Sequence, residues 1–215
     1  MTVFISRREL LKRAGLAGAV AAVAPAFAVG GAAAGTQTTA VRSAARERLE
    51  TLTGAESDVL EAIAARLIPT DANGPGATEA RAARYIDRAL GGALASSRST
   101  YQAGLNALDA YARSTRGRPF AELSAPDQDA VLADVESGAA PGFADGSAAF
   151  FNLVRTHTIQ GTFSDPYYGG NASFVGWDMV GYPGVRTIVT PDEQRLGADV
   201  PRNHKSAYDY DMFTK

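Results

Sequence analysis

The chain has 215 residues, which predicts one domain or at most two, and it contains no cysteine and only two histidines. The absence of cysteine excludes disulfides, thiolate metal sites, cysteine nucleophiles and covalent attachment of c-type haem. The formal net charge of −2 argues against a nucleic-acid-binding protein with a broad basic face. The apolar fraction of 46% is sufficient for a hydrophobic core.

The N-terminal 34 residues have the organisation of a bacterial export signal. A basic segment that ends at Arg13 is followed by an uncharged run rich in Ala and Gly, residues 14–29. Two tripeptides with a small residue at the first and third positions, 26–28 and 32–34, suit cleavage by signal peptidase. The run is too short and too weakly apolar for a membrane span. An Ala-rich amphipathic helix is an alternative, but it leaves the paired arginines unexplained.

The paired arginines, Arg7 and Arg8, belong to the segment Ser-Arg-Arg-Glu-Leu-Leu-Lys at residues 6–12, which resembles the twin-arginine export motif with Leu10 in place of the usual Phe. Translocation machinery reads such a signal, which is an address rather than an anchor. We therefore expect residues 1–34 to be a twin-arginine signal peptide that directs a folded protein to the periplasm. Its removal changes the net charge from −2 to about −5, because four basic residues and one acidic residue leave.

The sequence after the signal predicts an all-α fold. We expect a linker over residues 35–52, a helical domain over 53–186 and an extended tail over 187–215. Apolar residues recur at helical spacing in five segments, and no convincing alternating strand pattern occurs before residue 160. The expected helices run from a capping box at Thr53 to Pro69, from Ala82 to about Leu94, through Tyr101 to Gly117, from Ser124 to Gly138, and from Ser147 onward with Phe150, Phe151 and Val154 buried. Short connections favour a bundle of about five helices.

A segment rich in aromatic residues and glycine follows the fifth helix and predicts an ordered irregular loop rather than a flexible linker. Its aromatic residues are Phe163, Tyr167, Tyr168, Phe174, Trp177 and Tyr182. Two compatible interpretations are open: an aromatic plug that caps the core, and a recognition surface. The tail is polar but ends in aromatic residues, so we expect either disorder or an arm that becomes ordered on a partner.

The segment 161–184, hereafter the signature loop, carries a resemblance to one family. Gly161-Thr-Phe163-Ser-Asp165-Pro-Tyr-Tyr-Gly-Gly-Asn171 and Gly176-Trp-Asp-Met-Val-Gly-Tyr-Pro-Gly184 resemble the signature of the gluconate 2-dehydrogenase subunit 3 family. The N-terminal signal and the helix that ends Arg66-Leu-Ile-Pro-Thr-Asp71 are similar to the family as well. The resemblance covers roughly residues 1–186.

This resemblance implies a small, non-catalytic subunit of a membrane-associated bacterial dehydrogenase for sugars, sugar acids or polyols. The family's large subunit resembles glucose–methanol–choline oxidoreductases and holds FAD, and a multihaem cytochrome c often forms a third subunit. The small subunit bears the twin-arginine signal and is thought to export and stabilise the flavin subunit. On this basis no cofactor is expected in this chain. Residues expected to contact the partner are Phe163, Asp165, Pro166, Tyr167, Tyr168, Asn171, Trp177 and Tyr182, and we favour Trp177 and Tyr182.

Several sharper hypotheses compete with this interpretation. His157 could act as a general base oriented by Asp165, or it could be a buried residue that fixes the loop by hydrogen bonds. The alternative functions are therefore an independent exported enzyme and a sugar-binding module that use His157 and residues 161–184. Asp165-Pro166 is typical of a turn, and residues 169–171 are typical of positive φ angles with a side-chain cap rather than of a phosphate cradle.

No calcium site is expected either, because Asp71, Asn73 and Asp145 lack the twelve-residue pattern that a glutamate closes. We therefore predict neither a catalytic residue nor a metal ligand. The chain also has no dinucleotide-binding glycine fingerprint that follows a strand and opens a helix.

Overall fold

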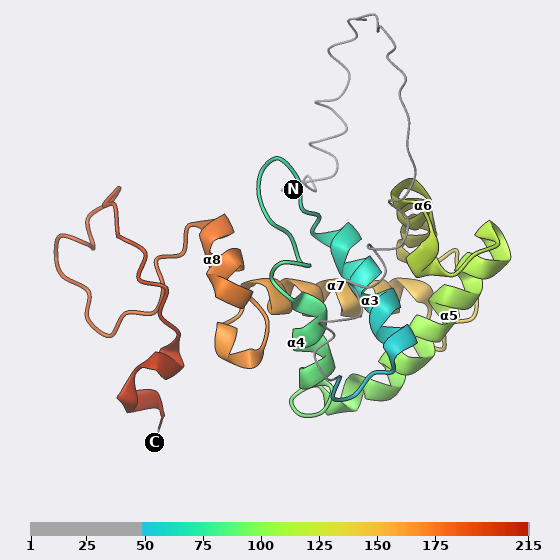
Figure 1. Ribbon diagram of the computed structural model, residues 1–215, viewed down its shortest axis with the longest axis horizontal. Helices are drawn as coiled ribbons and strands as arrows, with labels where there is room; N and C mark the ends of the chain where they lie inside the picture. Colours follow the sequence, from blue (N-terminus) through green and yellow to red (C-terminus); the bar gives the residue numbers. More distant parts are fainter. Residues whose placement is uncertain (1–48, 215) are drawn as a thin grey trace, which may run out of the picture. The chain divides into compact units, whose positions relative to one another are not determined.

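The computed structural model describes residues 49–214, which all belong to one unit, Arg46–Lys215. The export signal with Arg7 and Arg8 lies outside the described residues. The all-α prediction is confirmed: the described part of the chain contains six α-helices and no β-strand (Figure 1). The helices are α3 (Gly54–Leu67), α4 (Ala82–Ala89), α5 (Arg98–Arg116), α6 (Ala125–Glu136), α7 (Ser147–Phe163) and α8 (Val175–Val180).

Helix boundaries follow the local signals in the sequence. Thr53 and Glu56 form the predicted capping box, in which Thr53 Oγ1 accepts from the Glu56 amide and Glu56 Oε2 accepts from the Thr53 amide at 2.8 Å. Ser124 caps α6 by accepting from the Asp127 amide. Gly117 ends α5 in the left-handed conformation with φ 73°, which glycine adopts without steric cost.

Two expected boundaries differ from the structure. The second helix ends at Ala89 rather than near Leu94, because the chain turns at Gly91 and Gly92 and then forms a short 3₁₀ helix, Ala95–Ser97. The aromatic segment also contains more helix than expected. It includes the 3₁₀ helices Pro166–Tyr168 and Ala172–Phe174 in addition to α8.

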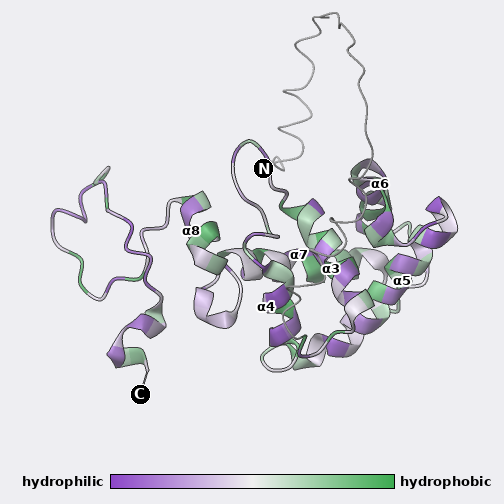
Figure 2. Cartoon of the chain, viewed as in Figure 1, coloured by the Kyte–Doolittle hydropathy of each residue, from purple (hydrophilic) through white to green (hydrophobic). Residues whose placement is uncertain are grey.

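Helix α7 packs against each of α3, α4, α5 and α6, so the segment that precedes the signature loop lies inside the bundle (Figure 1). Its side chains Phe150, Phe151 and Val154 are buried in the main core, as predicted. Figure 2 shows hydrophobic and hydrophilic residues alternating along α4, α5 and α6, as expected for helices that cover a core on one side. The large fully buried side chains of this core include Leu60, Ile63, Ile86, Tyr101, Leu105, Leu108 and Phe120.

The described chain enters the bundle through a polar anchor on α4. The buried carboxylate of Asp87 accepts hydrogen bonds from the amides of Glu50, Thr51 and Leu52 at 2.8–3.0 Å. Arg84 lies 2.9 Å from the same carboxylate, which compensates the buried negative charge. The end of the expected linker is therefore fixed against α4, and Leu52 is buried in the core.

Candidate functional site

The signature loop is fixed to the C-terminal end of α7 by close backbone approaches that only glycine allows. A Cβ atom on Gly170 would lie 2.0 Å from the Gly161 carbonyl oxygen, and one on Gly176 would lie 1.8 Å from the Thr162 carbonyl oxygen. The Asn171 amide donates to the Gly161 carbonyl at 2.7 Å. Two glycines of the motif therefore serve backbone packing, since any larger residue would force these segments apart.

Asn171 holds the loop together from inside. Its side chain is fully buried, donates to the Ser164 carbonyl at 2.8 Å and accepts from the Gly176 amide at 2.7 Å. Asn171 and Gly169 have positive φ angles, as predicted, whereas the prediction is wrong for Gly170, which is needed for close approach instead. The amides of Gly169 and Asn171 donate to carbonyls of the chain itself, so they form no phosphate cradle.

Trp177 packs beneath the loop and belongs to its interior. The indole is 6% exposed, and its Nε1 donates to the Phe163 carbonyl at 2.9 Å. Phe174 and Tyr182 contact its ring with centroid distances of 5.4 and 4.8 Å. Trp177 is therefore a buried residue of the loop itself, while Tyr182, which is 41% exposed, lies at the surface beside it.

Asp165 forms the predicted turn and also binds the tail. Its Oδ1 accepts from the Tyr167 amide at 2.9 Å, which caps the short helix that Pro166 begins. The same carboxylate accepts from the Ser206 hydroxyl at 2.6 Å and from the Ala207 amide at 2.9 Å. One motif residue thus orders its own loop and a segment about forty residues further along the chain.

The bound tail adds a third tyrosine to the two in the loop. Tyr208 stacks on Tyr167 with a centroid distance of 3.6 Å and an interplanar angle of 15°. Its hydroxyl lies 2.9 Å from the hydroxyl of Tyr168. This hydrogen bond, together with desolvation, raises the pKa of Tyr208. The tail is therefore placed on the signature loop by specific contacts, which sequence patterns did not indicate.

A second anchor joins the tail to α8. Asp178 lies 2.9 Å from the His204 imidazole and 2.8 Å from the Arg202 guanidinium. The hydrogen bond from His204 is the main cause of the lowered pKa of Asp178, and Arg202 adds to it. The His204 ring also stacks on Phe174 at 5.1 Å. The tail is thus attached to the first half of the loop at Asp165 and to the second half at Asp178.

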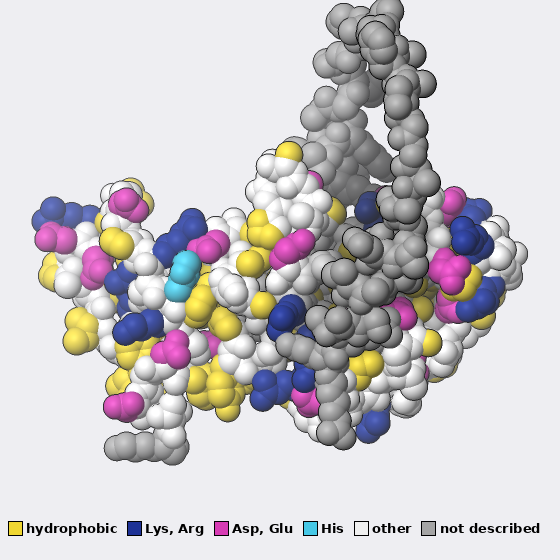
Figure 3. All heavy atoms as spheres, in the orientation of Figure 1, with side chains coloured by type: hydrophobic (Ala, Val, Ile, Leu, Met, Phe, Trp, Pro, Cys, Tyr) yellow, Lys and Arg dark blue, Asp and Glu magenta, His cyan; other side chains and the backbone are white. Residues whose placement is uncertain are grey.

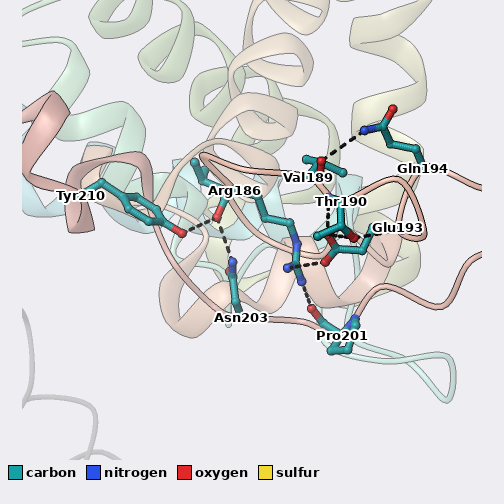
Figure 4. A network of polar contacts seen from close by, with 9 residues as sticks. Arg186, Val189, Thr190, Glu193, Gln194, Pro201, Asn203 and Tyr210 are labelled. Atoms are coloured by element: carbon teal, nitrogen blue, oxygen red, sulfur yellow. Dashed lines mark hydrogen bonds and ion pairs between the residues drawn. The ribbon is translucent and has the colours of Figure 1, made fainter.

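Between these contacts the tail makes a closed excursion over residues 186–202. Figure 4 shows Arg186 directed toward Glu193 and the Pro201 carbonyl. Asn203 and Tyr210 both donate to the Val185 carbonyl, at 2.9 and 2.8 Å (Figure 4). The excursion is therefore closed at its base by polar contacts.

His157 lies in the bundle core and not in a reactive cleft. Its Nδ1 lies 3.0 Å from the Tyr101 hydroxyl, and the two rings stack at 5.8 Å. Burial lowers the pKa of His157, which favours the neutral imidazole. Asp165 binds Tyr167 and the tail instead, so the structure does not form the dyad in which Asp165 would orient His157 as a base.

The residues predicted to contact a partner fall into three groups. Asn171 and Trp177 are buried, which makes them supports of the loop rather than contact residues in this structure. Phe163, Asp165 and Pro166 are half-buried, whereas Tyr167, Tyr168 and Tyr182 are 41–50% exposed. Contact with a partner stays a prediction, and the exposed residues Tyr167, Tyr168 and Tyr182 are now the candidates for it. Sequence reasoning missed the tail residues Ser206 and Tyr208, for which the aromatic C-terminal end was the available signal.

Over residues 49–214, no three His, Asp or Glu side chains are grouped so that they could hold a metal ion. The Asp71 carboxylate accepts from the Asn73 amide at 2.7 Å, which is a local turn contact. None of the helices in the same range combines the length and the apolar character needed to cross a bilayer.

A family model described as gluconate 2-dehydrogenase subunit 3 matches residues 54–184, which is more than half of the chain and includes the whole signature loop from Gly161 to Gly184. No curated protein and no solved structure matches the chain. The tail lies beyond the matched residues.

The buried histidine predicts a pH-dependent stability. The folded state holds the pKa of His157 below its unfolded value of about 6.5, so below that pH the unfolded chain binds a proton that the folded chain does not. The stability that depends on neutral His157 should therefore be fully present above pH ~6.5. Toward lower pH, the free energy of unfolding should fall by at most about 1.4 kcal/mol per pH unit. The free energy of unfolding, measured by urea unfolding between pH 7.5 and 5.5, should depend less on pH in His157→Gln than in the wild type. An equal pH dependence in the two proteins would contradict the assignment.

The double role of Asp165 predicts how the tail is released. Asp165→Ala removes the acceptor for Ser206 and Ala207, and hydrogen bonds to a charged group contribute about 1.5–3 kcal/mol each. Limited chymotrypsin digestion followed by mass spectrometry should show cleavage at Tyr208 and Tyr210 about tenfold faster or more.

Asp192→Ala is the matched control, because it removes only an exposed ion pair with Arg195, which is worth about 0–1 kcal/mol. Cleavage in this variant should stay at the wild-type rate. The role of Asp165 as the tail anchor is wrong if Asp165→Ala and Asp192→Ala are cleaved equally slowly.

Proposed function

The chain belongs to the gluconate 2-dehydrogenase subunit 3 family, and we propose from this premise that it is the non-catalytic accessory subunit of an FAD-dependent dehydrogenase for sugars, sugar acids or polyols. Its partner would be a flavin-containing large subunit of the glucose–methanol–choline type. The observation that carries the proposal is the family match over residues 54–184, which coincides with the bundle and its signature loop.

The geometry of the loop supports a binding role. Glycines and Asn171 fix the backbone, and Trp177 fills its interior, while Tyr167, Tyr168 and Tyr182 remain exposed. Aromatic side chains on a fixed backbone supply contact area at a small cost in conformational entropy. A rigid surface with exposed tyrosines is therefore suited to a stable interface with another subunit.

The division of chemistry between subunits is part of the proposal. The chain has no cysteine for covalent attachment of c-type haem and no dinucleotide-binding glycine fingerprint. We place FAD in the large subunit and haem c in a third, cytochrome subunit where the complex contains one. Residues 49–214 would then contribute surface and stability rather than redox chemistry.

Export is the second part of the proposed role. The twin-arginine motif with Arg7 and Arg8 would direct the chain and its folded flavin partner together to the periplasm. The chain would bind the flavin subunit in the cytoplasm, engage the translocation machinery, and remain in the membrane-associated complex. This role requires that the partner has bound before export.

The alternative of an independent exported enzyme loses its candidate base. His157 is buried in the bundle and is paired with Tyr101, and Asp165 binds the tail instead of His157. The observed contacts give both residues structural roles, so we do not advance the enzyme or a sugar-binding module as a second function.

Purification from the native cell tests the proposal. The full chain with a tag after Lys215 should be recovered from the periplasmic or membrane fraction together with a flavin protein, which is identified by mass spectrometry and by flavin absorbance. Recovery of the chain alone, without flavin, would contradict the accessory role.

A paired variant tests export. Arg7→Lys with Arg8→Lys keeps the charge but alters the twin-arginine motif, so both subunits should accumulate in the cytoplasm as a complex that still contains flavin. Normal export of the flavin protein in this variant would rule out the carrier role. Lys12→Arg, which leaves the arginine pair intact, is the control and should export both subunits as the wild type does.

A further inference from the structure

We propose that the signature loop and the tail together form a docking surface for a basic segment of the partner subunit. This tyrosine surface consists of Tyr167, Tyr168, Tyr208, Asp209 and Phe213. The proposal rests on the proposed function, because the partner is the flavin subunit, but it adds a location and a chemistry that the family match does not supply. The match ends at residue 184, before the three tail residues.

The tyrosine surface borders an open hollow of about 560 Å³. The loop contributes Pro166, Tyr167 and Phe174 to its lining, and the tail contributes Tyr208, Asp209 and Phe213. Tyr167 and Phe213 are each 50% exposed. Figure 3 shows hydrophobic side chains at the surface beside acidic ones where the C-terminal end of the tail lies in Figure 1. Residues of both the loop and the tail therefore form the walls of the hollow.

The rings that border the hollow are held in place before any partner binds. Tyr208 is fixed by its stack on Tyr167 and its hydrogen bond to Tyr168, and Asp165 holds the backbone at Ala207. Binding a partner would thus order few additional side chains, which lowers the entropic cost of association. This pre-organisation distinguishes the surface from a tail that becomes ordered only on the partner.

The charge of the hollow indicates the chemistry of its occupant. Asp209 is exposed and lines the hollow, Asp211 follows two residues later, and the described lining contains neither Lys nor Arg. Arg88 on α4 contacts the loop nearby, and its guanidinium donates to the Tyr167 carbonyl at 3.2 Å. A carboxylate beside aromatic rings suits a guanidinium or ammonium group, through a charge-assisted hydrogen bond and cation–π contact.

The tail already contains one cation–π contact between its own residues. The Lys205 ammonium lies over the Tyr210 ring at 5.3 Å from its centroid. The stack of Tyr167 on Tyr208 covers only one face of each ring. A cation–π contact uses a ring face, and Asp209 is the charged residue in the described lining, so an arginine- or lysine-bearing segment of a protein fits the surface better than a neutral sugar or an anionic sugar acid.

Three variants of the full chain test the proposal against the flavin subunit purified from the native complex. Asp209→Asn removes the charge but keeps an acceptor for the Ser206 amide, which Asp209 binds at 2.7 Å. Tyr208→Ala removes the ring that completes the surface. Asp199→Asn removes a charge at an exposed tail position away from the hollow and is the matched control.

Dissociation constants measured at low and at high salt should separate these variants. We expect Asp209→Asn to weaken binding about 5- to 30-fold at low salt and to reduce the salt dependence, and Tyr208→Ala to weaken it about tenfold or more. Asp199→Asn should stay within about twofold of wild type. Circular dichroism and the chymotrypsin assay check that the tail remains bound in Asp209→Asn, which is the deciding variant.

The outcomes distinguish this inference from the proposed function. If wild type binds the flavin subunit and Asp209→Asn binds equally well with the same salt dependence, the tyrosine surface is not the docking site, although the accessory role stands. If the wild-type chain binds no flavin subunit, the proposed function fails and this inference fails with it. Free gluconate at millimolar concentration could instead displace the flavin subunit from the wild-type chain while Asp209→Asn binds the flavin subunit as tightly as the wild type. That result would indicate a sugar site and overturn the proposal.

Discussion

The structure depends on the close approach of the signature loop to the end of α7. Gly170 and Gly176 lie against backbone carbonyls of Gly161 and Thr162, where no side chain fits. Asn171 then joins the loop to itself through its buried amide group. Without these contacts the loop would have no fixed conformation, because its aromatic residues alone do not specify one.

The remaining contacts depend on this constraint, each on the one before it. Once the loop is fixed, Trp177 fills its interior, and Asp165 and Asp178 present carboxylates to the tail. The tail in turn places Tyr208 against Tyr167 and forms the rim of the hollow. The chain thus uses its bundle as a base for a surface, which agrees with an accessory subunit whose catalytic partner is a separate protein.

Local features of the fold were predictable from the sequence, whereas long-range ones were not. The capping box at Thr53 and the stop at Gly117 act within a few residues, so the pattern identified them correctly. The return of the tail to Asp165 spans about forty residues and has no periodic signal. Composition likewise could not separate buried Trp177 from exposed Tyr182, since both are aromatic residues of the same motif.

Hydrogen exchange measured by mass spectrometry on the isolated full chain is the most direct test of the central claim, which is that the signature loop is a fixed part of the fold before any partner binds. The amides of Asn171 and Gly176, which donate to Gly161 and to Asn171, should exchange as slowly as those in the middle of α7. Exchange of these amides at the rate of an exposed loop, while α7 stays protected, would show that the loop forms only on the partner and would contradict the account.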